Sequence, residues 1–108
     1  MTTAMPPVVE TFIEVINHND SAAFPASFPA DGVVDDWGSR YVGHDAISVW
    51  NKREFIGKKV ALKVTGVEQE GYETSITADV GGNGFNGLSR FVFVVNGTLI
   101  QEMRITAS

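Results

Sequence analysis

The chain has 108 residues, 44% of them apolar and 19% charged, which is typical of one globular domain spanning 1–108 with a single hydrophobic core. Its formal net charge is −5 and it has no basic run, which argues against a nucleic-acid partner. It contains no cysteine, so disulfides, thiol catalysis and thiolate metal sites are excluded.

The sequence also shows no sign of membrane contact. No apolar run approaches the roughly 18 residues that a membrane-spanning helix needs. The opening segment, MTTAMPPVVE, has neither the basic stretch nor the apolar stretch of a signal peptide. Together with the missing cysteine, these features lead us to expect a soluble domain in the cytoplasm.

Two helices are expected near the start of the chain. A proline pair suits the first turn of a helix, and the apolar residues after it recur at helical spacing until the turn-forming segment NHND (17–20). A second, short helix over 21–28 would be capped by Asp20 or Ser21. Pro25 lies inside it, so we expect this helix to be kinked or to begin late.

A strand and a third helix follow. The segment GVVDDW (32–37) predicts a strand, and SRYV (39–42) is expected to continue it beyond a turn or bulge at Gly38. Helical spacing returns in HDAISVWNKREFIGKK (44–59), where Gly57 is the expected C-cap.

The second half of the chain alternates apolar and polar residues, which predicts four strands, at 60–67, 72–80, 88–95 and 98–106. Asn96-Gly97 is a strong hairpin signal between the last two, and Glu70-Gly71 is expected to join the first two. The glycine-rich segment 81–87 has no lysine and precedes a strand, so we interpret it as a rim around Phe85 and not as a phosphate-binding loop.

Helices therefore cluster early and antiparallel strands late, which predicts an α+β fold. The long strands need one face covered. Three helices in the N-terminal half would cover that face of a strongly curved, cone-shaped antiparallel sheet, and the curvature would leave a pocket between sheet and helices.

This element order resembles the nuclear transport factor 2-like superfamily, in particular its SnoaL-like branch. Three stretches carry the resemblance: VVETFIEVINHNDSAAF, GVVDDWGSRYVGHDAI and FVFVVNGTLIQEMRI. They are similar to the family's first helix and its step into the second, to a strand that ends in Asp before the third helix, and to the final hairpin. The resemblance implies a cone enclosing a pocket for a small apolar molecule, and it does not specify an activity.

Ketosteroid isomerase, an enzyme of this family, uses an Asp at the end of its first strand as general base, and Asp36 falls on that position. The Tyr and the second acid of that enzyme's oxyanion hole fall on Phe12 and near Ser89. Phenylalanine donates no hydrogen bond, so the resemblance supports at most the base.

Strand parity gives a second reason to single out Asp36. It shares its side of the strand with Val34, so if Val34 faces the pocket Asp36 does too, and Asp35 faces solvent. An aspartate in an apolar pocket resists ionising, which suits proton transfer near neutrality. The alternative is an exposed acid that ends a strand or caps a turn.

Neighbouring polar residues have two interpretations each. His44 could be an acid–base partner of Asp36 or a helix cap. Arg40 could pair with Asp36 or with an anionic ligand, or it could be a surface residue. Trp37 could stack on a planar ligand or cover the core, and Tyr41 could donate to a ligand or stay half-buried in its strand.

The apolar residues are expected first of all to form the core, and some could line the pocket at its mouth. The candidate ligand-binding residues are Phe12, Ile16, Phe24, Phe28, Trp37, Tyr41, Trp50, Phe55, Ser89 and Phe91. The two histidines lack metal-ligand spacing, so we expect neither a metal nor a cofactor.

Three functions remain open: a domain that binds a small hydrophobic ligand, an isomerase, cyclase or hydratase that uses Asp36 as general base, and a non-catalytic dimerisation module. The late strands carry apolar residues on both faces, with Val92 and Val94 opposite in parity to the phenylalanines and Ile100 opposite to Leu99. A sheet with one wet face alternates more cleanly. We therefore expect a homodimer through the sheet, with Val92 or Ile100 in the contact.

Overall fold

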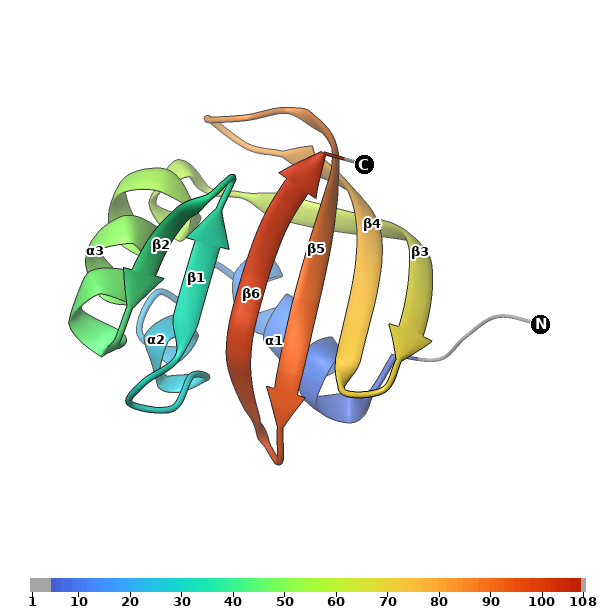
Figure 1. The fold of residues 1–108 in the computed structure, drawn as a ribbon. Coiled ribbons are helices and arrows are strands. Elements are labelled where there is room, and N and C mark those ends of the chain that lie inside the picture. Colours follow the sequence, from blue (N-terminus) through green and yellow to red (C-terminus); the bar gives the residue numbers. More distant parts are fainter. Residues whose placement is uncertain (1–4, 108) are drawn as a thin grey trace.

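The computed structural model describes residues 5–107, which form a curved six-stranded sheet with three α-helices gathered on its concave side (Figure 1). The elements in chain order are α1 (Pro7–Asn17), α2 (Ala23–Ala26), β1 (Val33–Asp36), β2 (Ser39–Val42), α3 (His44–Glu54), the 3-10 turn η1 (Ile56–Lys58), β3 (Ala61–Glu70), β4 (Glu73–Gly81), β5 (Gly87–Asn96) and β6 (Leu99–Ala107). The predicted α+β class and its three N-terminal-half helices are confirmed.

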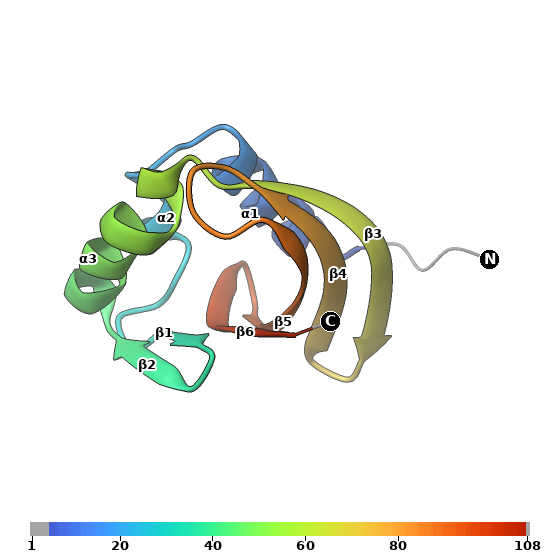
Figure 2. The same cartoon turned by 90° about the horizontal axis from the view of Figure 1, so that it is seen from above.

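The six strands lie in the order β2-β1-β6-β5-β4-β3, so the sheet is open, with β2 and β3 at its edges. Strand β1 runs parallel to β6, and every other neighbouring pair is antiparallel. The sheet is therefore mixed, and the expectation of a wholly antiparallel sheet was wrong at this one pair. Figure 2 shows the sheet curving around the interior, with β3 and β4 on one side and β1 and β2 on the other.

The first two strands form a hairpin whose turn lies at Gly38, as expected, but SRYV pairs back on the strand before it and does not continue it. Asp36 pairs with Ser39, so only Trp37 and Gly38 form the loop. Both have positive φ, 53° and 94°, which is the backbone of a type I′ turn. Gly38 is the ordinary residue for such a turn, whereas a tryptophan there is unusual.

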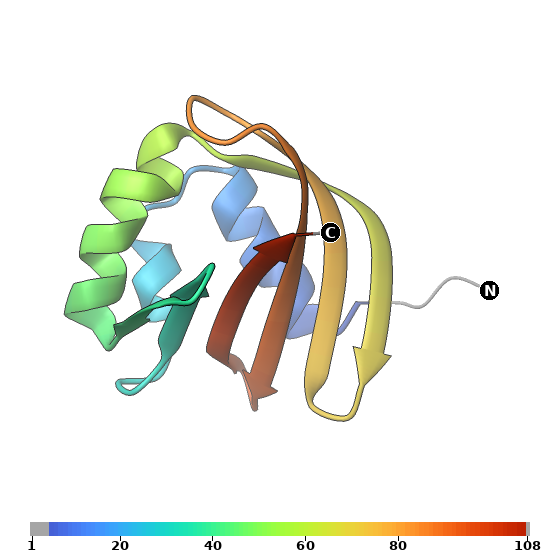
Figure 3. The ribbon, with the colours of Figure 1, turned by 45° about the horizontal axis from the view of Figure 1, so that its top comes forward.

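Helix α1 lies across the concave face of the sheet, behind the strands in Figure 3. Its apolar stripe is buried as the spacing predicted, at Val9, Phe12, Ile13 and Ile16. The helix ends at Asn17, whose side chain accepts a hydrogen bond from the Leu62 N–H at 2.7 Å and donates one to the Leu62 carbonyl at 3.0 Å. This amide pairs with the free edge of β3 as a neighbouring strand would.

The other two helices differ from expectation at their ends. Helix α2 begins late, as Pro25 suggested, and Asp20 caps it by accepting the Ala23 N–H at 3.1 Å. After α3 and η1, Lys59 takes the left-handed C-cap position with φ 54°, so Gly57 is not the cap. A Cβ on Gly57 would lie 1.5 Å from the Lys52 carbonyl oxygen, so the glycine is needed for close backbone approach.

The core fills the space between helices and sheet, with stacked and edge-on aromatic rings from α1, α2, α3 and β5 at its centre. Ile100 is fully buried in this core, so the expectation that it lies on the outer sheet face was wrong. A bulge between Val94 and Val95 shifts the register of β5 against β6 before Ile100 is reached. In residues 5–107, no helix is both long and apolar enough to cross a membrane.

Candidate functional site

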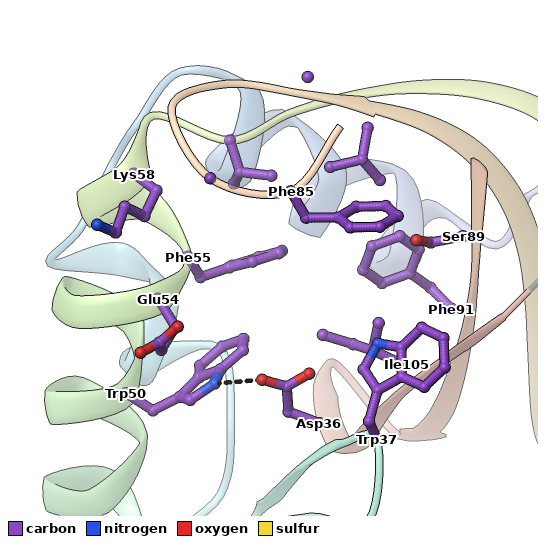
Figure 4. Close-up of a pocket in the computed structure, with 14 residues that line it drawn as sticks. Asp36, Trp37, Trp50, Glu54, Phe55, Lys58, Phe85, Ser89, Phe91 and Ile105 are labelled. Carbon is purple, nitrogen blue, oxygen red and sulfur yellow. Dashed lines mark hydrogen bonds between the residues drawn. The ribbon is translucent and has the colours of Figure 1, made fainter. Parts of the chain in front are cut away.

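A cavity of about 170 Å³ opens at the mouth of the cone, between the end of α3 and the curved sheet (Figure 4). Strands β1, β4, β5 and β6 supply one side, and α3, η1 and the loop before β5 supply the other. The lining residues are Asp36, Trp37, Trp50, Glu54, Phe55, Lys58, Val60, Val80, Gly81, Gly84, Phe85, Ser89, Phe91 and Ile105.

Asp36 is the last residue of β1, and its carboxylate lines the cavity. Its Oδ2 accepts a hydrogen bond from the indole Nε1–H of Trp50 at 3.1 Å, drawn as the dashed line in Figure 4. Val34, two residues earlier on the same side of the strand, is fully buried. Asp35 points to the other side, where it accepts the Gly38 N–H at 2.8 Å and pairs with Arg40.

Trp37 lies at the rim of this cavity and is 61% exposed. Its backbone N–H donates to the Ile105 carbonyl at 3.1 Å, which extends the β1–β6 pairing into the turn. A bulky residue in the left-handed region costs of order 1–3 kcal/mol unless its surroundings fix it. The fold therefore holds an exposed indole at the cavity mouth at some cost in stability.

Six of the predicted site residues meet at the cavity: Asp36, Trp37, Trp50, Phe55, Ser89 and Phe91. The Trp50 and Phe55 rings stack with centroids 5.0 Å apart and 25° between their planes. Ser89 is 2% exposed and lies on β5, on the same side of the strand as Phe91. Figure 4 places the Ser89 hydroxyl near the Phe85 and Phe91 rings.

Four other predicted ligand-binding residues lie away from this cavity, packed with one another in the core: Phe12, Ile16, Phe24 and Phe28. Phe12 also lines a separate, more open groove of about 520 Å³ between α1, α2 and the start of β6. No charged side chain lines that groove. A third groove, of about 410 Å³, lies beside β3 and β4 and is lined by Asn17, Lys63, Asp79 and Asn86 among others, so it is polar where the cavity around Asp36 is mainly aromatic.

The other three polar site candidates, Arg40, His44 and Tyr41, do not line the cavity. Arg40 pairs with Asp35 at 3.4 Å and reaches Glu102 at 4.0 Å, so it does not pair with Asp36. His44 begins α3, and its Nε2 donates to the Phe28 carbonyl at 2.7 Å, away from the cavity. Tyr41 packs against Trp50, with ring centroids 6.0 Å apart, on the side away from the lining.

Of the lining residues that sequence reasoning did not select, three have charged or aromatic side chains: Glu54, Lys58 and Phe85. Phe85 is 57% exposed in the glycine-rich loop, and an isolated aromatic in such a segment was the signal for it. The loop is held to η1 by the Asn83 N–H, which donates to the Lys58 carbonyl at 2.8 Å. Glu54 and Lys58 carried no such signal, because they look like ordinary charges at a helix end.

Charge in the cavity wall is sparse. Glu54 is paired with its neighbour Arg53 at 3.2 Å, and both are about half exposed. No cationic side chain of residues 5–107 lies within 4 Å of the Asp36 carboxylate. Within the same residues, no group of three His, Cys, Asp or Glu side chains is arranged to hold a metal ion. The arrangement offers an apolar enclosure with one oriented carboxylate, able to accept a hydrogen bond or a proton.

Comparison with solved structures matches this architecture to a known cone. A proposed polyketide cyclase from Sinorhizobium meliloti superposes with a TM-score of 0.80 at 23% identity, over 94% of this chain and 95% of that one. A protein with a ketosteroid isomerase-like fold from Catenulispora acidiphila, in complex with trimethylamine, gives a TM-score of 0.83 at 22% identity, over 97% and 88%. The chain has the nuclear transport factor 2-like fold.

A nuclear transport factor 2-like protein of unknown function from Cytophaga hutchinsonii also covers all of this chain and 95% of its own, with a TM-score of 0.79 at 14% identity. No protein-family model and no curated protein sequence matches the chain. At these identities the likeness establishes the nuclear transport factor 2-like fold. The chemistry must be argued from the side chains in the cavity.

Proposed function

We propose that the chain is a ligand-binding domain of the SnoaL-like type, which holds a small, mainly apolar molecule in the cone cavity with Asp36 as its polar anchor. The observation that carries the proposal is the Asp36 carboxylate, which Trp50 orients at the wall of a cavity otherwise lined mainly by aromatic and aliphatic groups. Such an enclosure with one or two convergent polar groups is the usual form of a small-molecule site. The complex of a similar structure with trimethylamine is consistent with it.

The size of the cavity limits the ligand. An engineered cavity of about 150 Å³ in another protein binds benzene, so a cavity of similar size suits roughly six to eight non-hydrogen atoms. So few atoms give limited binding free energy, and we expect dissociation constants between about 10 μM and 1 mM.

Cyclohexanol, with seven non-hydrogen atoms, is a suitable probe for this proposal. Titration followed by ¹H–¹⁵N NMR should shift the indole N–H signal of Trp50, because that group lies in the cavity wall. Ser89→Leu should abolish the shift by filling the cavity. Ser75→Leu is the matched control, since Ser75 lies on the next strand with the opposite side-chain direction. Saturation that survives Ser89→Leu would rule out binding in this cavity.

An acid–base enzyme is the second candidate, of the isomerase, cyclase or hydratase kind. It is favoured by the second carboxylate oxygen, Asp36 Oδ1, which has no hydrogen-bond partner among the described residues and can take a proton from a ligand. The position that corresponds to the oxyanion-hole tyrosine of ketosteroid isomerase supplies no hydrogen-bond donor, because it is Phe12, which is packed in the core. The side-chain hydrogen-bond donors that line the cavity besides Trp50 are Trp37, Ser89 and Lys58.

Benzisoxazole tests this second candidate without knowledge of the natural substrate, because its ring opens when a base removes its carbon-bound proton. General-base catalysis by a positioned carboxylate is worth about 10²–10⁴-fold. If the chain is an acid–base enzyme, it should catalyse the ring opening, and Asp36→Asn should lower the rate by about that factor. Equal rates for the parent and Asp36→Asn would remove the enzyme alternative and leave the binding proposal standing.

We also propose that the chain forms a homodimer through the outer face of the sheet. Val92 and Val94 point to this face, since Phe91 and Phe93, which alternate with them along β5, are buried in the core; Val94 is half-buried and Val92 is 8% exposed. The two valines are framed by ion pairs of Arg104 with Glu73 and with Glu102. A patch of apolar residues with a polar rim is the usual anatomy of a stable interface.

A further inference from the structure

Asp36 is the only carboxylate in the cavity lining that has no cationic partner among residues 5–107. Its hydrogen-bond partner is the neutral N–H of Trp50, whereas Glu54, the other acid in the lining, already pairs with Arg53. A charge placed in apolar surroundings costs free energy unless it is paired. A cationic ligand would supply the missing pair, and an ionised carboxylate can only accept hydrogen bonds, so it selects for donors.

The aromatic lining favours the same ligand. Five aromatic side chains line the same cavity as the Asp36 carboxylate: Trp37, Trp50, Phe55, Phe85 and Phe91. A cation over the face of an aromatic ring gains about 0.5–2 kcal/mol, most for tryptophan. A carbonyl or carboxylate oxygen gains no cation–π attraction from these rings, and an ionised Asp36 would repel it.

The backbone adds to this preference. Trp50, Glu54 and Phe55 come from the last turn of α3 and the residue after it, where the helix dipole places partial negative charge. Lys52 and Arg53 in the same turn are exposed and offset part of that charge. The remaining cation, Lys58, lies at the outer edge of the cavity, and its nitrogen points away from Asp36 in Figure 4.

We propose that the cavity selects a small organic cation, a protonated amine of roughly six to eight non-hydrogen atoms, with Asp36 as its counter-ion. This inference rests on the proposed ligand-binding function and names the ligand's chemical class. Asp36 then acts as an electrostatic anchor, with no proton transfer required. The apolar part of the amine would lie against the aromatic rings, and its nitrogen against the free Oδ1.

Cyclohexylammonium and cyclohexanol test the inference, because they share one ring shape and one number of non-hydrogen atoms and differ in charge. NMR titration at pH 7 through the Trp50 indole signal should show at least tenfold tighter binding of cyclohexylammonium. Asp36→Asn should remove the difference while cyclohexanol still binds, because asparagine still offers an oxygen to the Trp50 N–H. Asp45→Asn, which changes the net charge equally at an exposed position on α3, should keep the preference.

The outcomes separate the two proposals. Equal affinity for the two probes, or a preference that survives Asp36→Asn, overturns the cation proposal and leaves the binding pocket intact. Failure of both probes to bind overturns the ligand-binding function itself, and the cation proposal with it. A preference that falls equally in Asp36→Asn and Asp45→Asn also overturns it, because the preference would then reflect the charge of the whole chain.

Discussion

The Trp50 indole N–H and the Asp36 carboxylate form a 3.1 Å hydrogen bond that joins helix α3 to the end of strand β1. The bond does two things at once. It ties the helix to the part of the sheet where the β1–β2 hairpin begins, and it fixes the orientation of Asp36 so that one oxygen stays free for the cavity. Trp50 itself is 1% exposed and packs between Phe24, Tyr41 and Phe55, so the donor is held rigidly.

A double-mutant cycle with Trp50→Phe and Asp36→Ala measures this bond. The expected coupling energy is about 1 kcal/mol. A hydrogen bond to a charged group is stronger than one between neutral groups, but the partial exposure of this bond to water lowers its net contribution. Urea unfolding of the four proteins gives the value. The Tyr41–Arg53 contact, at 3.5 Å and exposed, is the comparison, and its coupling should be near zero. No coupling between Trp50 and Asp36 would show that the bond does not fix the carboxylate.

Replacing Trp37 by asparagine should raise stability and weaken ligand binding. Asparagine before Gly38 gives the preferred sequence of a type I′ turn, and relief of the left-handed tryptophan is worth about 1 kcal/mol. The cyclohexanol titration and urea unfolding measure the two effects. Trp37→Ala is the control, because it removes the ring without relieving the backbone and should weaken binding with little gain in stability. A loss of stability in Trp37→Asn would contradict the argument.

The sequence predicted the local strand pairings of this fold but not the β1–β2 hairpin or the parallel β1–β6 pair. Alternation and Asn96-Gly97 were sufficient for the four late strands, because their pairing is local in sequence. The β1–β2 hairpin was missed because Trp-Gly does not look like a type I′ turn, and only tertiary contacts hold it there. The parallel β1–β6 pair joins segments about seventy residues apart, and no short pattern encodes such a partner.

The candidate site was predicted in part for the same reasons. Strand parity predicted that Asp36 and Val34 share one side of the strand. In the structure Val34 is buried and Asp36 lines the cavity, because alternate residues of a strand point to the same face. The deep position of Phe12 and Phe24 could not be derived, because apolar spacing does not separate core from cavity lining. Glu54 was missed because its place depends on where α3 ends, which the sequence located several residues too late.

Gly57→Ala should destabilise the protein by about 3 kcal/mol, since the new Cβ would overlap the Lys52 carbonyl oxygen and the backbone must move. The matched control is Gly66→Ala in strand β3, whose Cβ would meet its nearest atom at 3.9 Å and should change stability by less than about 1 kcal/mol. Thermal unfolding compares the two. Because η1 anchors the loop that carries Phe85, Gly57→Ala should also weaken the binding of cyclohexanol. Similar stabilities of the Gly57→Ala and Gly66→Ala proteins would refute the argument that Gly57 is needed for close backbone approach.

The Asn17 side chain should contribute more to stability than its exposed position suggests, because it makes two hydrogen bonds to the Leu62 backbone. Asn17→Ala should cost about 2 kcal/mol. Asn17→Asp should cost no less, because it keeps the acceptor but turns a carboxylate oxygen toward the Leu62 carbonyl in place of the donor. Asn86 also makes two hydrogen bonds to backbone carbonyls, but within its own exposed loop. Asn86→Ala should therefore cost less, below about 1 kcal/mol. Equal losses for Asn17→Ala and Asn86→Ala would contradict a special role for the link between α1 and β3.

Light scattering across a dilution series tests the proposed dimer. We expect twice the 11.7 kDa mass of one chain at micromolar concentration, and an interface of about 800 Å² or more per chain. Val94→Lys should return the mass to 11.7 kDa without unfolding the protein, because the cross-strand neighbours of Val94 are Glu73 and Glu102, which can pair with the new lysine. Val49→Lys is the matched control: Val49 is 60% exposed on α3, away from the sheet, and its replacement should leave the dimer intact. A mass of 11.7 kDa for the parent, or equal dissociation by both lysine variants, would exclude the outer sheet face as a specific contact.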